Sequence, residues 1–384
     1  MMMMANELPE DLVTQILLWL PVVSLLRFKC VCKSWYALIT HQNFVRKHLL
    51  RNKNSNTHLL LSTFNKTMDD YVISTISYEE LQISLTHPLP RTYFENSENF
   101  CISVVGSYNG LVCLHVYDTL KVVIWNPTTR ETKVVPESNL PIFAPAGYFT
   151  RIQDMGFGFD AKTNDYKIIN FVSMYEPIYD AYSMKDVKEI RFQKEVYSLS
   201  TDSWRKVDGP QCFISDGTFT YTTGMGSWLA YVEDPKLFVL SFDMSDEVFL
   251  KTPLPDNVTG HSLFMLNESI AMVALMPVDE RWREIGYDIW LLLKVGVKDS
   301  WNRLFTIGPS IARIHQPLGF WKNDTMFLTK VDSGQLFLYD PSTQQMTDLQ
   351  IHGHSDSKQM QLVTYMETLV SVKGGNESEE KDNC

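Results

Sequence analysis

The chain has 384 residues, of which 45% are hydrophobic, and its formal net charge is −11. This is the composition of a globular chain that is long enough to bury a full core. A run of about 18 apolar residues that could span a bilayer is missing, and the first residues lack the basic and then apolar pattern of a secretory signal. We therefore expect a cytoplasmic protein, with the nucleus as the second option.

Charge and cysteine content narrow the choice of partners. Residues 8–51 carry a net charge of +4, whereas residues 52–373 sum to −11. An acidic body argues against binding to nucleic acid or to an anionic membrane and favours a basic protein partner. The six cysteines contain no C-x-x-C pair, so we expect reduced thiols, no metal site and no cofactor: Cys30, Cys32, Cys101, Cys113, Cys212 and Cys384.

The first 51 residues have the spacing of four short helices. Pro9 fits the first helical position, and Glu10 and Asp11 complement the helix dipole. Five apolar residues then follow at helical spacing, before Pro21 ends the helix, and predict one apolar face: Leu12, Val13, Ile16, Leu17 and Leu20. Four short helices make a thin core, so part of this apolar surface could serve as a docking face.

The segment LPEDLVTQILLWLPVVSLLRFKCVCKSWYALI, residues 8–39, resembles an F-box. In that family the module binds the Skp adaptor of a cullin-RING ubiquitin ligase, and the rest of the chain holds the substrate. The resemblance implies Skp contacts at nine matching positions: Leu8, Pro9, Ile16, Leu20, Pro21, Leu25, Val31, Cys32 and Trp35. The alternative is a helical cap whose apolar residues serve only its own core. Because no second pair follows the C-x-C of Cys30 and Cys32, we interpret these residues as buried thiols rather than metal ligands.

From about residue 52, short strands separated by turns replace the helical spacing. A strand-turn-strand pattern recurs six times, in segments that start at residues 122, 157, 196, 239, 289 and 336. The six turns lie 34 to 51 residues apart, which is typical of propeller blades. We therefore expect a β-propeller, with THLLLSTF (57–64) and YVISTISY (71–78) closing the ring by joining the last blade. In the first repeat, the side chains of Asn126 and Thr128 are expected to bond the backbone of their own turn.

Longer motifs identify the propeller more closely. GSYNGLVCL (106–114), IWNPTTRE (124–131) and VYSLSTDSWR (196–205) resemble the F-box-associated interaction domain of plants. Within that family, the sequence looks most like the S-locus F-box and S-locus F-box-like group, with the immune-regulating F-box proteins close behind. Members of the first group recognise pollen-rejecting ribonucleases, which are basic.

The expected fold class is thus α plus all-β, with a small N-terminal helical F-box followed by a β-propeller-like domain. The expected divisions are an N-terminal extension (1–7), the F-box (8–51), the propeller (52–373) and a disordered tail (374–384). The tail is expected to be disordered because it is rich in charge and poor in apolar residues.

The sequence has no G-x-S-x-G, H-E-x-x-H, Walker A or RING-type pattern. We therefore expect a non-catalytic substrate receptor that binds Skp, and through it a cullin, together with a protein target that is basic. The loops of one propeller face are the candidate target site. The first candidate is the Tyr-rich stretch 174–193, which we expect to be irregular, and the loops 137–153 and 277–288 are secondary candidates. The residues assigned to the target are Tyr175, Tyr179, Asp180, Tyr182, Arg281 and Trp282.

Two other classes of function remain open. A free-standing propeller could bind a ligand such as a saccharide and ignore Skp. A propeller hydrolase would instead need acids and histidines that converge at the centre of the ring.

Overall fold

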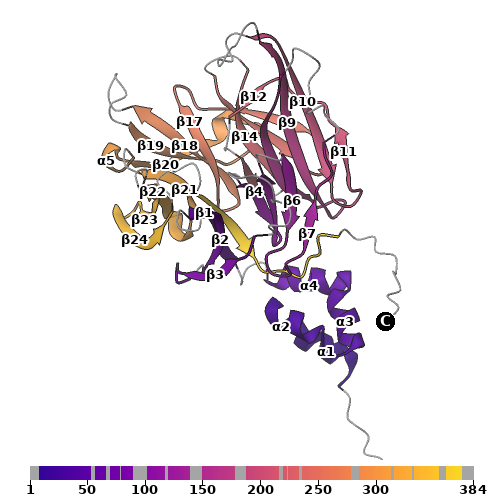
Figure 1. Cartoon of the computed structure of the whole chain (residues 1–384). Coiled ribbons are helices and arrows are strands. Elements are labelled where there is room, and N and C mark those ends of the chain that lie inside the picture. Colours follow the sequence, from indigo (N-terminus) through magenta and orange to yellow (C-terminus); the bar gives the residue numbers. More distant parts are fainter. Residues whose placement is uncertain are drawn as a thin grey trace, which may run out of the picture.

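The computed structural model describes residues 8–373, with the exception of these segments: 53–56, 66–69, 78, 90–101, 117–119, 139–148, 178–186, 216–218, 223, 233–235, 278–284, 313–314, 331–332 and 354–359. Four helices come first: α1 (Glu10–Leu17), α2 (Val22–Phe28), α3 (Lys33–Thr40) and α4 (Gln42–Asn52). Figure 1 shows that they pack together as one module beside a ring of sheets. The expected fold class, a helical module followed by a propeller, is confirmed.

Prolines set the starts of α1 and α2. The N–H groups of Leu12 and Val13 donate to the Pro9 carbonyl at 2.9 and 3.1 Å, and Pro21 accepts in the same way at the start of α2. Each proline is therefore the N-cap, so Pro9 lies one residue before the helical position that we predicted. Helix α1 ends at Leu17 and does not continue to Pro21.

The described strands form six sheets, which we number as blades 1 to 6 and give from the innermost to the outermost strand. Blade 1 has β25 (Gln361–Met366), β1 (Thr57–Asn65), β2 (Asp70–Ile76) and β3 (Ile83–His87). Blade 2 has β4 (Ile102–Tyr108), β5 (Leu111–Val116), β6 (Lys121–Trp125) and β7 (Thr132–Val134). Blade 3 has β8 (Phe149–Asp160), β9 (Asp165–Pro177), β10 (Val187–Ser198) and β11 (Ser203–Lys206).

The other three blades follow in chain order. Blade 4 has β12 (Phe213–Ile214) and β13 (Thr220–Thr222) inside, then β14 (Met225–Tyr231), β15 (Phe238–Asp243) and β16 (Phe249–Pro253). Blade 5 has β17 (Thr259–Leu266), β18 (Ser269–Pro277), β19 (Ile285–Leu292) and β20 (Trp301–Ile307). Blade 6 has β21 (His315–Phe320), β22 (Met326–Lys330), β23 (Gln335–Asp340) and β24 (Gln345–His352). Three short helical segments are η2 (Lys298–Ser300), α5 (Pro309–Ala312) and η3 (Lys322–Asp324).

The two ends of the propeller sequence close the ring. Strand β25 pairs with β1, which joins residues that are about 300 positions apart, and β1 pairs in turn with β2. The innermost strands then contact one another around the axis, in the order β25, β4, β8, β12 and β13, β17 and β21. The segments 57–64 and 71–78 were predicted to close the ring by joining the last blade. They do take part in the closure, but β1 and β2 form blade 1 with β25 and not blade 6, which contains the last repeat. Blade 1 is therefore composite, because only β25 comes from the C-terminal end.

The six sequence repeats do not correspond one to one with the six blades. The repeats that start at residues 157 and 196 both lie in blade 3, as the hairpins β8–β9 and β10–β11. Blade 1 contains none of the six repeats. The expectation of one blade per repeat was therefore wrong at these two positions.

The hydrophobic core lies between neighbouring sheets. One cluster joins Phe171 and Val196 of blade 3 to Trp228 and Leu240 of blade 4, and comparable clusters fill the other interfaces between blades. Each sheet is thus covered by its neighbours around the ring, which a single blade could not achieve.

We call the two ends of the ring the module face and the far face. Strand β1 begins at Thr57, directly after the helical module, and Thr57 pairs with Met366 at the end of β25. The opposite end of β25, at Gln361, marks the far face.

Candidate partner-binding surfaces

Helix α1 is apolar on two sides. Val13 and Leu17 face the core of the helical module, where Leu17 is fully buried. Leu12 and Ile16, one residue before each of them, point to solvent with 51% and 52% of their surface exposed. Leu8 continues the same line four residues before Leu12 and is also exposed. We call Leu8, Leu12 and Ile16 the exposed stripe. The five apolar residues predicted to share one face are therefore divided between a core side and a solvent side.

The nine predicted Skp-binding positions fall into three classes of exposure. Six are exposed: Leu8, Pro9, Ile16, Pro21, Val31 and Cys32. Leu20 and Trp35 are half-buried and pack against the core of the module. Leu25 is fully buried, so in this structure it could only support a docking surface from behind.

Sequence reasoning did not assign five exposed apolar residues of the module to a binding surface: Leu12, Trp19, Val23, Tyr36 and Leu50. Leu12 completes the exposed stripe, and Trp19 and Tyr36 are 71% and 57% exposed. The Arg51 guanidinium lies over the Trp19 ring, 2.9 Å from its centroid, and so covers one face of the indole. The spacing of Leu12 with Ile16 was visible in the sequence, but nothing local told a core-facing pair from a solvent-facing pair.

Cys30 and Cys32 are exposed, so the interpretation of both as buried thiols was wrong. They lie in and after the turn between α2 and α3, which Val31 closes with a hydrogen bond from its N–H to the Phe28 carbonyl. The Cys32 sulfur lies 3.1 Å from the Ser34 hydroxyl, and this hydrogen bond lowers the pKa of the Cys32 thiol. This turn therefore presents an apolar and a polarisable side chain next to each other.

The last described residues, 367–373, connect the helical module to the propeller, and we call them the C-terminal strap. Leu369 of the strap is 5% exposed and belongs to the core cluster of the helical module. Val372 is buried in the cluster between blades 2 and 3. The strap therefore contributes to the cores of both parts of the chain.

The turn of blade 2 holds the strap in place. Asn126 is fully buried, and its amide Nδ2 donates to the carbonyls of Thr368 and Val370 at 3.2 and 2.8 Å. Its Oδ1 accepts from the N–H groups of Thr128 and Thr129, so the predicted turn contacts of Asn126 are confirmed. The prediction was wrong for Thr128, whose hydroxyl lies 2.6 Å from the Tyr365 hydroxyl instead. One amide thus serves both the local turn and a segment more than 240 residues away.

Two further contacts support this joint. Gly110 has φ +79°, and a Cβ at this position would lie 2.1 Å from Thr368, so the close approach of the strap requires glycine. Lys29 of the module approaches Glu131 of blade 2. Burial lowers the pKa of Lys29, and the Glu131 charge partly opposes this effect.

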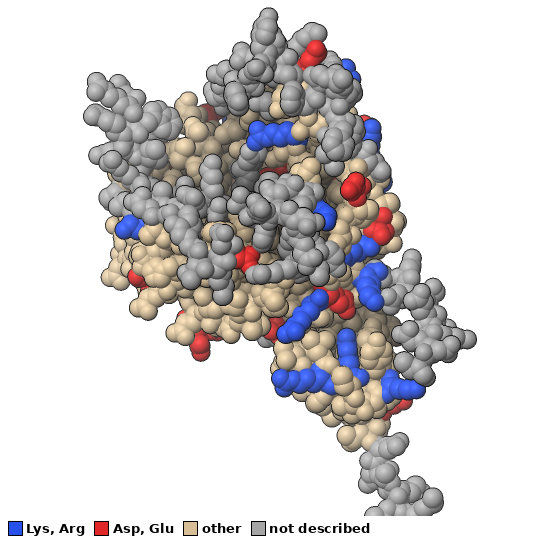
Figure 2. Space-filling model, in the orientation of Figure 1, with Lys and Arg blue, Asp and Glu red and all other residues tan. Residues whose placement is uncertain are grey.

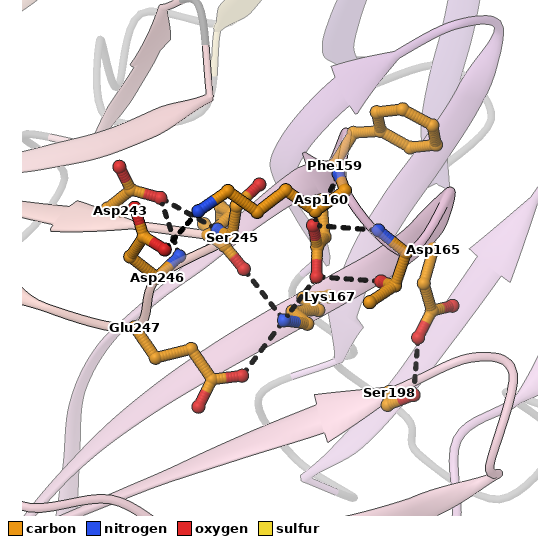
Figure 3. Close-up of polar contacts among 12 residues, drawn as sticks. Phe159, Asp160, Asp165, Lys167, Ser198, Asp243, Ser245, Asp246 and Glu247 are labelled. Atoms are coloured by element: carbon orange, nitrogen blue, oxygen red, sulfur yellow. Dashed lines mark hydrogen bonds and ion pairs between the residues drawn. The ribbon is translucent and has the colours of Figure 1, made fainter.

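A network of charged residues clasps blade 3 to blade 4 near the module face (Figure 3). Lys167 is 9% exposed, and its Nζ lies 2.7 Å from Asp160, 2.8 Å from Glu247 and 2.7 Å from the Met244 carbonyl. Burial alone would raise the pKa of Asp160, but hydrogen bonds from Lys167 and Thr163 outweigh it and hold that pKa below its ordinary value. We call Asp160, Lys167 and Glu247 the blade clasp. Lys167 is paired with the carboxylates of Asp160 and Glu247, so these charges are neutralised within the clasp. We therefore assign the blade clasp a structural role.

Charge is divided between the two parts of the chain. Figure 2 shows Lys and Arg side chains gathered over the helical module and the adjoining edge of the propeller. The sequence of the module contains six Lys and Arg residues: Arg27, Lys29, Lys33, Arg46, Lys47 and Arg51. The helical module is thus basic, whereas residues 52–373 carry a net charge of −11.

The described ends of the Tyr-rich stretch that was predicted to bind a target, residues 174–177 and 187–193, lie at the far face. Tyr175 is half-buried in β9 and pairs with Ile190 of β10. The other five predicted target residues lie outside the described residues: Tyr179, Asp180, Tyr182, Arg281 and Trp282. The stretch 174–193 is less irregular than expected, because residues 174–177 and 187–193 belong to the long hairpin β9–β10. This part of the prediction was wrong.

Two searches over the described residues gave no candidate. None of the helices described is long and apolar enough to cross a membrane. Nowhere among the residues that have described positions do three or more His, Cys, Asp or Glu side chains gather as metal ligands would.

Two protein families match the sequence. The F-box associated beta propeller domain matches residues 62–372, and the F-box domain matches residues 6–47. Three similar proteins come from Arabidopsis thaliana. F-box/kelch-repeat protein At3g23880 is 26% identical over 386 residues, covering 95% of this chain and 96% of the relative. F-box protein At3g07870 is 28% identical (91% and 88% covered), and F-box protein CPR1 is 24% identical (93% and 87% covered).

Proposed function

Since this chain belongs to the F-box proteins that carry an F-box associated beta propeller domain, we propose that it is the substrate-recognition subunit of a Skp-cullin-F-box ubiquitin ligase. An F-box implies a Skp-type adaptor as the partner. The observation that carries the proposal is the exposed stripe on α1, where Leu8, Leu12 and Ile16 are each more than half exposed. An apolar stripe of this kind is stabilised when a partner covers it.

The adaptor would bind the outer side of α1 and the turn between α2 and α3. Val31 and Cys32 add exposed contact area there, while buried residues such as Leu25 hold the helices in place. The basic side chains around this surface would contact acidic groups of the adaptor and speed association. The residues buried in such an interface are expected to contribute most of its binding free energy.

The target would bind the far face of the propeller, at the end of the ring opposite the helical module. The hairpin β9–β10, which includes Tyr175, extends this face. In such an arrangement the chain performs no chemistry itself. It raises the effective concentration of target lysines near a ubiquitin-loaded enzyme that the cullin holds, and ubiquitinated targets would then be degraded.

A basic protein is the target class that the charge favours, because residues 52–373 sum to −11. An S-locus ribonuclease, as in self-incompatibility, is one candidate of this class. Turnover of an immune receptor or of another regulatory protein is the alternative within the same ligase function. A free-standing binding propeller is the alternative outside it, in which the exposed stripe would have no partner.

The test is capture from plant extract in which the proteasome is blocked, with the full chain and the full chain carrying L12D and I16D as two baits. We expect Skp and cullin to be captured by the unaltered chain alone, and target proteins to be captured by both baits. If the unaltered chain captures neither Skp nor cullin, the ligase proposal is wrong and the free-standing propeller is favoured.

A further inference from the structure

A cavity of about 360 Å³ lies at the axis of the propeller, between the innermost strands. Residues from blades 1, 2, 4, 5 and 6 line it, and none of these described lining residues is Asp, Glu, Lys or Arg. By contrast, 21% of the whole chain is charged and residues 52–373 sum to −11. The axial cavity is therefore an uncharged space inside an acidic propeller. Its apolar walls with a few polar groups are typical of ligand sites.

Three of the strands around the axial cavity carry a β-bulge. The extra residue is Val105 in β4, His261 in β17 and Leu318 in β21. A bulge redirects a side chain that regular pairing would place elsewhere. All three extra residues line the cavity, so the irregular pairing shapes its wall.

Aromatic rings form part of this wall. Phe264 of β17 and Phe320 of β21 meet edge to face, with their ring centroids 6.3 Å apart. Phe219, which directly precedes β13 in blade 4, lines the same cavity. All three side chains are half-buried, so part of each ring is free to contact a ligand. Such rings favour another aromatic ring in an edge-to-face or offset arrangement.

His261 adds an accessible polar group to the wall. The residue is exposed, and its Nδ1 lies 3.3 Å from the Ser262 hydroxyl, which leaves Nε2 for another partner. The protein around the ring removes water from it and lowers the pKa of His261 below its ordinary value, so the imidazole is neutral at pH 7. A neutral imidazole that carries its proton on Nδ1 accepts a hydrogen bond at Nε2.

These features select against charged ligands and favour a polar aromatic ring. An ion that enters the cavity loses water and meets no opposite charge among the described lining residues. An aliphatic ligand would contact the walls but leave His261 Nε2 without a partner. A phenol or an indole satisfies both requirements, because its ring contacts the phenylalanines and its O–H or N–H donates to the imidazole.

We propose that the axial cavity binds an uncharged aromatic group that carries one hydrogen-bond donor, of the phenol or indole type. The ring lies among Phe219, Phe264 and Phe320, and its O–H or N–H donates to His261 Nε2. A free small molecule and a Tyr or Trp side chain of a target protein both offer this chemistry. The inference goes beyond the ligase function, because adaptor binding by the helical module does not require it.

The test measures the affinity of four probes for the purified full chain by ligand-observed saturation-transfer NMR. 2-Naphthol has the ring and the donor, 2-methylnaphthalene has the same shape without the donor, and 2-naphthoate is an anion. N-acetyltryptophanamide represents a side chain of a target protein. We expect 2-naphthol to bind with submillimolar affinity and 2-naphthoate to bind at least about tenfold more weakly.

Two variants and one control assign the binding to the axial cavity. H261F keeps a ring but removes the acceptor, and the affinity ratio of 2-naphthol to 2-methylnaphthalene should fall at least about fivefold. M265E places a carboxylate at a cavity position that is 37% exposed, and it should weaken 2-naphthol binding at least about tenfold. The control V297E changes a residue of blade 5 that is 39% exposed and does not line the cavity, so binding should stay the same.

Failure of the unaltered chain to bind 2-naphthol would overturn the proposal. So would equal affinity for 2-naphthoate, an unchanged probe ratio in H261F, or equal losses in M265E and V297E. Equal binding of N-acetyltryptophanamide and 2-naphthol would support the proposal with a target side chain as the source of the ring. Binding of 2-naphthol without N-acetyltryptophanamide would support it with a free small molecule as the source.

Adaptor binding, measured on the same samples, separates this inference from the ligase function. Intact adaptor binding without binding of 2-naphthol contradicts the proposed role of the cavity alone. Binding of 2-naphthol by a chain that ignores the adaptor supports the role of the cavity and contradicts the ligase function.

Discussion

The helical module and the propeller bury their apolar side chains in different ways. In the propeller each sheet is covered by its neighbours, and clusters such as that around Trp228 are almost inaccessible to solvent. The module has one small core cluster, and this cluster includes Leu369 of the C-terminal strap. Leu8, Leu12 and Ile16 of the module are still exposed. The propeller is thus complete by itself, whereas the module has surface that a partner would cover.

The largest effect should come from charges placed on the exposed stripe. We expect L12D combined with I16D to weaken adaptor binding about a thousandfold, or about 4 kcal/mol, because two carboxylates would be buried in an apolar interface. The measurement is the dissociation constant of the purified full chain for a Skp-type adaptor. The matched control is V248D, since Val248 in blade 4 is 50% exposed, close to the 52% of Ile16. A similar loss in both variants would show that the stripe has no special role.

Breaking the blade clasp should have the next largest effect. K167M leaves the carboxylates of Asp160 and Glu247 without their shared cation in a mostly buried site, so we expect the free energy of unfolding to fall by about 3 kcal/mol. The control K162M removes an ion pair with Asp246 whose two side chains are both more than half exposed, and should cost less than about 1 kcal/mol. Urea titration followed by circular dichroism gives both values, and equal costs would contradict the role of burial.

The strap should matter more for the module than for the propeller. L369A removes a side chain that is 5% exposed in the module core, and we expect a loss of about 2 kcal/mol from the stability of the helices. Hydrogen exchange of peptides from α1 to α4 is the measurement, with peptides of blade 5 as the internal reference. Uniform deprotection of module and propeller would contradict a local role for Leu369.

The smallest effect should be the acid dependence of the blade clasp. The pKa values of Asp160 and Glu247 are both held below their ordinary values in the folded chain. The folded state therefore binds these protons less tightly than the unfolded state, and the stabilisation is complete above about pH 5 and decreases as the pH falls below about 4.

We expect the difference in unfolding free energy between the unaltered chain and D160N to stay constant from pH 8 to pH 5. It should then shrink by about 1 kcal/mol by pH 3. The measurement is urea unfolding of both proteins at each pH. A difference that grows as the pH falls would have the wrong sign for carboxylates with lowered pKa values.

Turn residues and strand patterns in the sequence predicted strands and turns correctly, but they did not give the number of blades. Asp160 and Asp243 both accept hydrogen bonds from the N–H groups two and three residues later, and a residue with positive φ follows at the fourth position in both turns. One of these turns joins the first two strands of a blade, and the other joins the third and fourth strands. The same kind of turn, opened by an aspartate, therefore occurs at two different places in a blade, so the spacing of such turns does not give the number of blades.

The module was predictable as helices, but its contacts were not. Pro9 and Pro21 indicated where α1 and α2 begin to within one residue, because proline has no N–H to lose at a helix start. Which of Leu12 and Val13 faces the core depends on α2 to α4 and on Leu369, which is more than 350 residues away. Long-range packing of this kind leaves no periodic signal in the sequence.

Hydrogen exchange of the full chain, alone and with a Skp-type adaptor, tests most directly whether the module and the propeller divide the binding between them. Peptides that cover residues 8–41 should gain protection with the adaptor, while peptides from the far face, such as those that begin β4 and β8, should not change. Protection of the far face instead of α1, or no protection at all, would contradict the account.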